Sequence, residues 1–224
     1  MKESIEQILA VLTKEIKSEF RTRYAISAVL LFILTTVTMI VFATAGEEIT
    51  SDMASGILWV IMFFGAMTGL SKSFVSEEER GTSFLLQISA NPISVYFGKL
   101  LFNIILSLSL NIFSVFLFFI FNNSITVVHL SDFLIVLLLG SVGLAGATTI
   151  ISALISKANT KNALFPVLSF PVILPLIVLG IKITKYTFDS GLVTKIGGDF
   201  QMITAYCGIM ITASFFLFDL VWRD

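Results

Sequence analysis

The densest group of charges in this chain lies between two long apolar runs, in the stretch SEEERGTSFLLQ that begins at Ser76. Consecutive carboxylates contribute little to how a chain is oriented in a membrane, because Lys and Arg carry that information. A purely topological role therefore fits these residues poorly, and a contact with another protein fits them better. The charges of this stretch belong to Glu77, Glu78, Glu79 and Arg80, and Gly81 follows them.

Apolar residues at helical spacing follow these charges. Phe84, Leu85 and Ile88 recur at that spacing, and Asn91-Pro92 then breaks the pattern. Acidic residues in a first turn suit the positive end of a helix dipole. We predict a short amphipathic helix that lies parallel to the membrane and carries the glutamates in its first turn.

A second polar pattern lies inside the next apolar run. Asn103, Ser107 and Asn111 are four residues apart and share one face of a helix. Polar side chains at such a depth either line a pathway or hydrogen-bond neighbouring helices. The sequence leaves both roles open.

Common catalytic and metal-binding motifs are missing from the chain. Neither the phosphate-binding G-x-x-x-x-G-K-[ST] nor H-E-x-x-H nor G-x-S-x-G occurs. The single cysteine, Cys207, and the single histidine, His129, exclude an internal disulfide and a Cys/His zinc site. We predict that the chain is not an enzyme and holds no metal or cofactor of its own. Its net charge of −1 argues against nucleic acid as a partner.

The elements that position these residues follow from the composition. Charged residues make up 13% of the chain, where a soluble domain carries about 25%. Six runs come close to the roughly 20 apolar residues that cross a bilayer as a helix. We predict an all-α integral membrane protein with six transmembrane helices in a single domain, residues 1–224. The predicted spans are Ala25–Ala45, Met53–Leu70, Leu100–Phe121, Phe133–Ile155, Ala163–Ile181 and Phe200–Trp222.

Lys and Arg in the short connections predict the orientation. Only Lys182, Lys185 and Lys195, all in the fifth connection, lie on the opposite side from the N-terminal segment. The other eleven place both termini in the cytoplasm. They are Lys2, Lys14, Lys17, Arg21, Arg23, Lys72, Arg80, Lys99, Lys157, Lys161 and Arg223.

The N-terminal segment, residues 1–24, has an amphipathic helical pattern and precedes the six-span bundle of residues 25–222. It is predicted to be an interfacial helix on the cytoplasmic membrane surface, although the same pattern suits a helix packed on a partner. The sequence FATAG at Phe42 resembles a signal-peptide cleavage site. The long apolar run before it and the structured N-terminal segment favour a retained span instead.

Two spans have an unusual composition. The fourth carries glycines that allow close helix–helix contact, within the chain or across a dimer: Gly140, Gly143 and Gly146. The fifth carries three prolines, which remove backbone donors and predict a kinked or locally unwound helix. Such a helix either simply packs in its bent form or moves as a gate. These prolines are Pro166, Pro171 and Pro175.

The stretches LWVIMFFGAMTGLSKSF and FVSEEERGTSFLLQISANPISVYFGKLL resemble the ABC-2-type transporter permeases. Within that group the chain is similar to the CcmB family, the haem exporter permease subunits of bacterial cytochrome c maturation. The resemblance is densest from Leu58 to Asn103 and weak after about Ala163. It implies a multi-pass protein of the bacterial cytoplasmic (inner) membrane.

The resemblance also implies partners. These are a separate ABC ATPase subunit that binds ATP, a second copy of this chain, a tryptophan-rich haem-handling membrane protein and a periplasmic haem chaperone. Residues Glu77–Gly81 would lie at the coupling helix that contacts the ATPase, and haem is the implied cargo. Two other functions stay open, a permease for a lipid, polysaccharide or drug, and a membrane scaffold that transports nothing.

Overall fold

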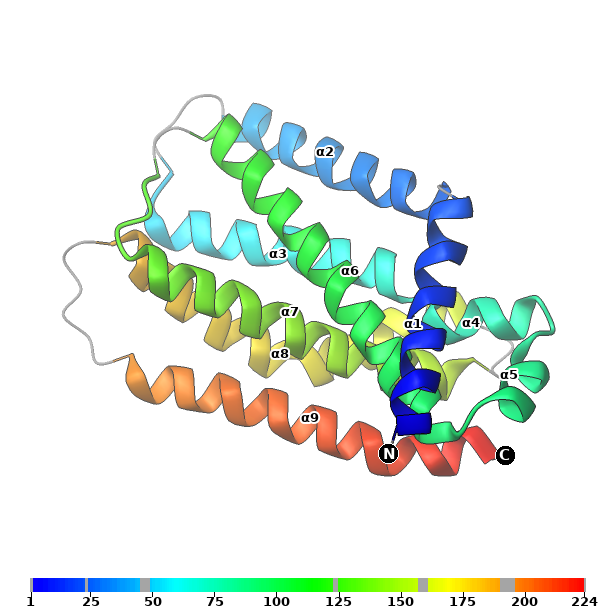
Figure 1. Ribbon diagram of the computed structural model, residues 1–224. Coiled ribbons are helices and arrows are strands. Elements are labelled where there is room, and N and C mark those ends of the chain that lie inside the picture. The colour runs from blue at the N-terminus through cyan, green and yellow to red at the C-terminus, as the bar shows by residue number, and fades with distance from the viewer. Residues whose placement is uncertain are drawn as a thin grey trace.

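The computed structural model describes residues 2–22, 24–44, 49–122, 125–156, 161–189 and 196–223. These residues form a helical bundle, and Figure 1 shows its long helices running side by side. In chain order the helices are α1 Lys2–Thr22, α2 Tyr24–Thr44, α3 Ser51–Leu70, α4 Lys72–Glu79, α5 Ser83–Ser89, α6 Pro92–Phe121, α7 Leu130–Ile155, α8 Lys161–Phe188 and α9 Gly197–Arg223.

The prediction of six membrane spans is confirmed within the described residues. Six helical segments are long and apolar enough to cross a bilayer. They begin and end close to the predicted positions, with three exceptions. The second segment continues through α4 to Glu79, α6 starts eight residues before Leu100, and α8 continues to Phe188. They are Ile26–Thr44, Ser51–Glu79, Pro92–Phe121, Leu130–Ile155, Leu164–Phe188 and Gly197–Trp222.

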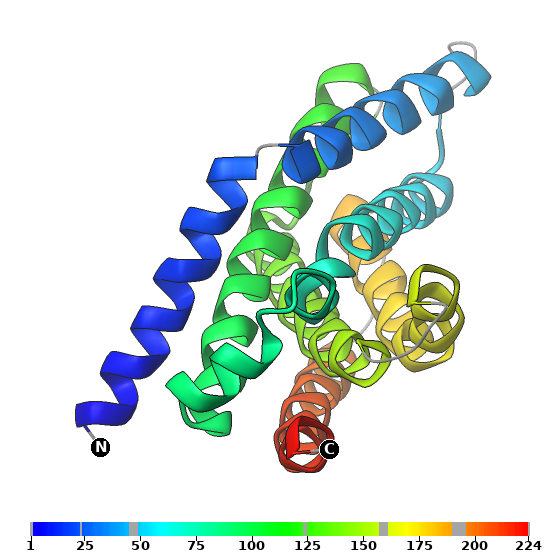
Figure 2. The same ribbon diagram turned by 90° about the vertical axis from the view of Figure 1, so that its right-hand side faces the viewer.

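Helix α7 is the most enclosed span and contacts α3, α6, α8 and α9, as the end-on view in Figure 2 shows. The three glycines predicted to mediate packing lie on it. Gly140 faces Trp59 of α3, Gly143 faces Leu176 and Cys207, and Gly146 faces Ile211 of α9. The contacts of these glycines therefore lie within the chain and join α7 to three different helices.

Trp59 is the largest side chain in this packing and is 1% exposed. Its indole lies between two glycines, and a Cβ added to Gly180 of α8 would come within 2.0 Å of the ring. The indole Nε1–H donates to Thr184 Oγ1 at 2.9 Å, so the one polar atom of the ring is satisfied. Trp59 thereby joins α3, α7 and α8 at a single point.

Helix α8 is continuous through Pro166, Pro171 and Pro175. Of the two predicted outcomes, local unwinding does not occur at these prolines, and a kink in the continuous helix stays a prediction. Neighbouring helices and local adjustments of the backbone commonly compensate for missing donors inside membrane proteins.

Helix α1 runs across one end of the bundle and packs along α6 (Figures 1 and 2). The approach is close at Gly98, where an added Cβ would lie 2.7 Å from Val11 Cβ. The side of α1 away from α6 keeps Ile5, Leu9 and Phe20 more than half exposed. The predicted helix is present, and it packs on a helix of its own chain while leaving an apolar face open.

Helix α1, helix α5 and the end of α9 lie at the same end of the bundle, called here the α5 end (Figure 1). The opposite end holds two of the three lysines of the fifth connection, whose charges count against the predicted orientation. Both of these lysines are paired with acids. Lys182 Nζ lies 2.8 Å from Asp199 Oδ1, and Lys185 Nζ lies 2.6 Å from Asp52 Oδ1. Arg23, Lys157 and Lys195 lie outside the described residues.

Candidate functional site

The connection between α3 and α6 forms two short helices separated by a sharp turn. Gly81 has φ +65°, a left-handed conformation that glycine adopts without a steric penalty. Its N–H donates to Glu78 O at 3.1 Å, and the N–H of Thr82 donates to Glu77 O at 2.9 Å, which is the Schellman pattern that ends a helix. The glutamates therefore end α4, and the prediction that they begin the amphipathic helix is wrong.

The amphipathic helix itself is present as α5. None of its residues is buried, and Phe84, Leu85 and Ile88 are each about 70% exposed. Two hydrogen bonds hold it at its ends, since Gln87 Nε2 donates to Trp222 O at 2.8 Å and Thr82 Oγ1 donates to Glu77 Oε2 at 2.6 Å. An exposed apolar helix with fixed ends is suited to contact a partner.

The three glutamates have different environments. Glu78 is partly exposed and Glu79 is exposed, as is Arg80. Glu77 is only 6% exposed and forms ion pairs with Lys14 of α1 and Lys99 of α6. Glu78, Glu79 and Arg80 therefore leave their charges at least partly exposed, whereas the charge of Glu77 is buried in ion pairs within the chain.

The ion pairs of Glu77 belong to a group that we call the Lys99 cluster, formed by Lys14, Glu15, Glu77 and Lys99. Lys99 is fully buried, and its Nζ lies 2.8 Å from Glu15 Oε1 and 3.5 Å from Glu77 Oε1. It also donates to Ser73 O at 2.6 Å and lies 4.8 Å from the centre of the Phe74 ring. Two cations and two carboxylates balance one another, as buried charges require.

Burial alone would lower the pKa of Lys14, but the charge of Glu15 and the hydrogen bond and charge of Glu77 outweigh it. The pKa of Lys14 is therefore raised above its ordinary value. This keeps Lys14 charged and able to pair with both carboxylates.

Lys99 is predicted from the sequence to be a charge of the connection, whereas the structure buries it completely. One feature pointed to this burial, because Lys99 stands among apolar residues in the stretch VYFGKLLF. A lysine in such a run needs an internal partner. Its partner Glu15 is 84 residues away in the chain, so the pair became visible only in the fold.

The polar face of α6 lies inside the bundle. Asn103 Nδ2 donates to Thr149 Oγ1 of α7 at 2.8 Å and to Ser73 Oγ of α4 at 3.2 Å. Asn111 Nδ2 donates to Ser141 Oγ at 2.9 Å. The amide nitrogens thus join α6 to α7, which supports the role of an interhelical contact.

Three atoms on this face have no hydrogen-bond partner among the described residues: Asn103 Oδ1, Ser107 Oγ and Asn111 Oδ1. Asn103 also lines a cavity of about 210 Å³ at the α5 end, together with Glu15, Glu19 and Arg80. Burial raises the pKa of the Glu19 carboxyl, and the negative charge of Glu15 raises it further, against the opposing charges of Arg80 and Lys72. The polar face therefore adjoins a polar cavity at its α5 end.

We predict that Ser107→Ala raises the stability of the protein, because it removes a buried hydroxyl without a described partner. Such a group costs roughly 1–3 kcal/mol. Ser114→Ala on the same helix is the matched control, since the Ser114 hydroxyl donates to Leu110 O at 2.9 Å. Thermal unfolding in detergent measures both variants. A loss of stability in Ser107→Ala as large as in the control would show that the hydroxyl has a partner.

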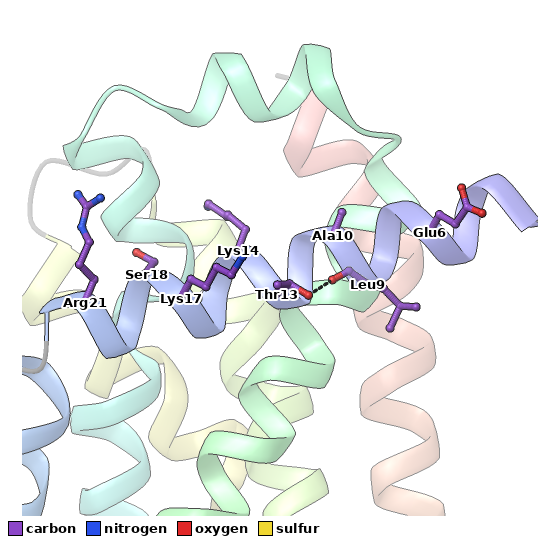
Figure 3. A pocket seen from close by; sticks show the side chains of 8 residues that line it. All are labelled: Glu6, Leu9, Ala10, Thr13, Lys14, Lys17, Ser18 and Arg21. Carbon is purple, nitrogen blue, oxygen red and sulfur yellow. Dashed lines mark hydrogen bonds between the residues drawn. The ribbon is translucent and has the colours of Figure 1, made fainter.

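A second hollow of about 840 Å³ runs along α1 at the same end. Figure 3 shows Lys14 and Arg21 pointing to the side of α1 on which α4 and α5 lie, and Lys17 stands between them in the sequence. Neither Lys17 nor Arg21 has an ion-pair partner among the described residues. This side of α1 is therefore basic, next to its exposed apolar face.

No group of three or more metal-binding side chains occurs in the described part of the chain. The α5 end thus combines an exposed apolar helix, exposed charges beside it and a buried ion cluster beneath it. A family model described as CcmB protein matches residues 6–219, which extends far beyond the part where the sequence resemblance was densest. No curated protein matches the chain.

Proposed function

This chain belongs to the CcmB family, the haem exporter permease family of cytochrome c maturation, and on that premise we propose that α5 is the contact through which a separate ATPase subunit drives it. CcmB proteins are membrane permease subunits that work with an ABC ATPase. The exposed apolar face of α5 is the observation that carries the proposal. Glu78, Glu79 and Arg80, next to that face, would fix the orientation of the partner, since charges at a contact mainly set partner choice and orientation.

The proposed energy transfer needs no ATP site in this chain, because ATP would bind to the partner subunit. The ATPase shifts the permease only if its nucleotide states bind α5 with different affinities. ATP hydrolysis is proposed to drive the delivery of haem and the release of the periplasmic haem chaperone that carries it. Two copies of each subunit and a tryptophan-rich haem-handling membrane protein would complete the assembly.

The α5 end is proposed to face the cytoplasm of a bacterial cell, with the six spans in the inner membrane. This orientation is supported by the excess of Lys and Arg at that end. The exposed Ile5, Leu9 and Phe20 of α1 would then enter the lipid interface, with Lys17 and Arg21 near the headgroups. Helix α1 is joined directly to the first span, which supports this position.

The triple variant Phe84→Ser, Leu85→Ser and Ile88→Ser tests the proposed contact. A fully buried side chain of this kind contributes about 1.5–3 kcal/mol, so the ATPase recovered with the tagged chain in mild detergent should fall at least about tenfold. Insertion should be unchanged, because no α5 residue is buried. Glu78→Gln with Glu79→Gln should weaken recovery less.

The matched control is Val128→Ser with Leu130→Ser, two exposed apolar residues at the opposite end of the bundle. This control should recover the ATPase as wild type does. Undiminished recovery in the α5 variant would refute the contact. Failure of the wild-type chain to recover any ATPase, across several detergents, would favour the scaffold function.

A further inference from the structure

The Lys99 cluster joins three segments that are distant in the sequence. Lys14 and Glu15 belong to α1, Glu77 to α4 and Lys99 to α6. The backbone of α4 packs mainly on α7, whereas α1 packs on α6. Helices α1 and α4 therefore meet mainly through side chains, and the cluster supplies the buried part of that contact.

The N-terminal end of α5 is attached to the same cluster. Thr82, the residue before α5, donates from its N–H to Glu77 O and from its hydroxyl to Glu77 Oε2. The other carboxylate oxygen of Glu77 pairs with Lys14 and Lys99. A displacement of α5 at its base must therefore displace Glu77, and with it the cations of α1 and α6.

Further hydrogen bonds join α1 to this connection, and two of those between described residues are exposed. Arg80 donates to Ser18 Oγ at 3.1 Å, and the N–H of Asn91 donates to Gln7 Oε1 at 3.3 Å. Exposed polar contacts exchange easily with water and hold two segments weakly. The buried Lys99, with three oxygen atoms within 3.5 Å, is the firm part of the link.

We propose that Lys99 is a positioning residue for energy transfer, which ties α1 to the α4–α5 connection so that α1 moves together with α5. Helix α1 then becomes a moving part of the permease as well as a membrane contact. The inference rests on the proposed contact between α5 and an ATPase. Its first test, however, needs no ATPase.

The first test measures the distance between spin labels on α1 and α5. Thr13→Cys and Ser89→Cys place labels on exposed positions, in a chain whose single cysteine is removed by Cys207→Ser. In nanodiscs without ATPase, the wild-type background should give one narrow distance distribution. The double variant Glu15→Gln with Lys99→Met removes one charge of each sign. In this variant the α1–α5 distance distribution should be at least twice as wide as in wild type.

The matched control removes an ion pair of the same length at the opposite end, with Lys182→Met and Asp199→Asn. Its α1–α5 distribution should stay as narrow as wild type. A wild-type distribution as broad as that of the double variant would overturn the inference, and so would a double variant as narrow as wild type. Neither outcome depends on whether α5 binds an ATPase.

The second test separates a positioning role from a merely structural one. In the complete complex, the double variant should recover the ATPase and hydrolyse ATP at nearly the wild-type rate, while haem delivered per ATP falls at least fivefold. The unfolding midpoint of the double variant should stay closer to wild type than that of Lys99→Met alone. If the double variant delivered as much haem per ATP as wild type, the positioning role would be overturned. If the wild-type chain recovered no ATPase, the proposed contact itself would be overturned.

Discussion

Replacing Lys99 alone by methionine is expected to destabilise the protein by about 3–5 kcal/mol, because it leaves buried carboxylates without their main cation. Glu15 and Glu77 are each under 10% exposed, and among the described residues Lys14 is the cation that would remain to pair with them. Because Lys14 still pairs with both carboxylates, we expect a loss of stability at the lower end of this range. For a chain of this length, the unfolding midpoint should fall by roughly 6–12 °C.

The control for this prediction is Lys182→Met, because its ion pair with Asp199 has the same 2.8 Å length. The Lys182 side chain is 63% exposed, and exposed pairs contribute only about 0–1 kcal/mol. Thermal unfolding of both variants in one detergent compares them directly. If both variants lowered the unfolding midpoint equally, burial would not be the reason why the Lys99 cluster stabilises the protein.

The second large effect is expected for Trp59→Ala, with a loss of about 3–5 kcal/mol. The indole fills the space between Gly140 and Gly180, and both glycines lack the side chains that would close the cavity left behind. The change also removes the donor to Thr184 Oγ1. The unfolding midpoint in detergent measures the loss.

Phe64→Ala is the control on the same helix, because Phe64 is 50% exposed. Lipid or detergent can fill the space that its ring leaves, so its cost should be less than half that of Trp59→Ala. A similar cost for both aromatic residues would argue that Trp59 does not join α3, α7 and α8 as described.

The membrane-spanning helices were predictable from the sequence because their cause is local. Each span must satisfy its own backbone hydrogen bonds inside lipid, so a sufficiently long apolar run predicts a helix wherever it packs. Helix α5 was predictable for a similar reason, since Phe84, Leu85 and Ile88 repeat at helical spacing. The error at its start came from Gly81, whose left-handed conformation places the glutamates in α4 instead.

The functional family was also accessible from the sequence, through the stretch around Glu77–Gly81 and the absence of a phosphate-binding loop in the chain. The different roles of the glutamates were not. Glu77, Glu78 and Glu79 are adjacent and chemically identical, and what separates them is which one faces Lys99 and Lys14. Those lysines come from segments that local sequence does not bring together.

The sequence by itself therefore determined the six spans, the exposed helix α5 and the family, because each depends on residues close together in the chain. Only the tertiary structure decided which charges are buried, which glycines contact the Trp59 ring, and that α1 packs on α6. The physical reason is that burial and pairing depend on side chains that meet across long sequence separations. No periodicity along a single segment records them.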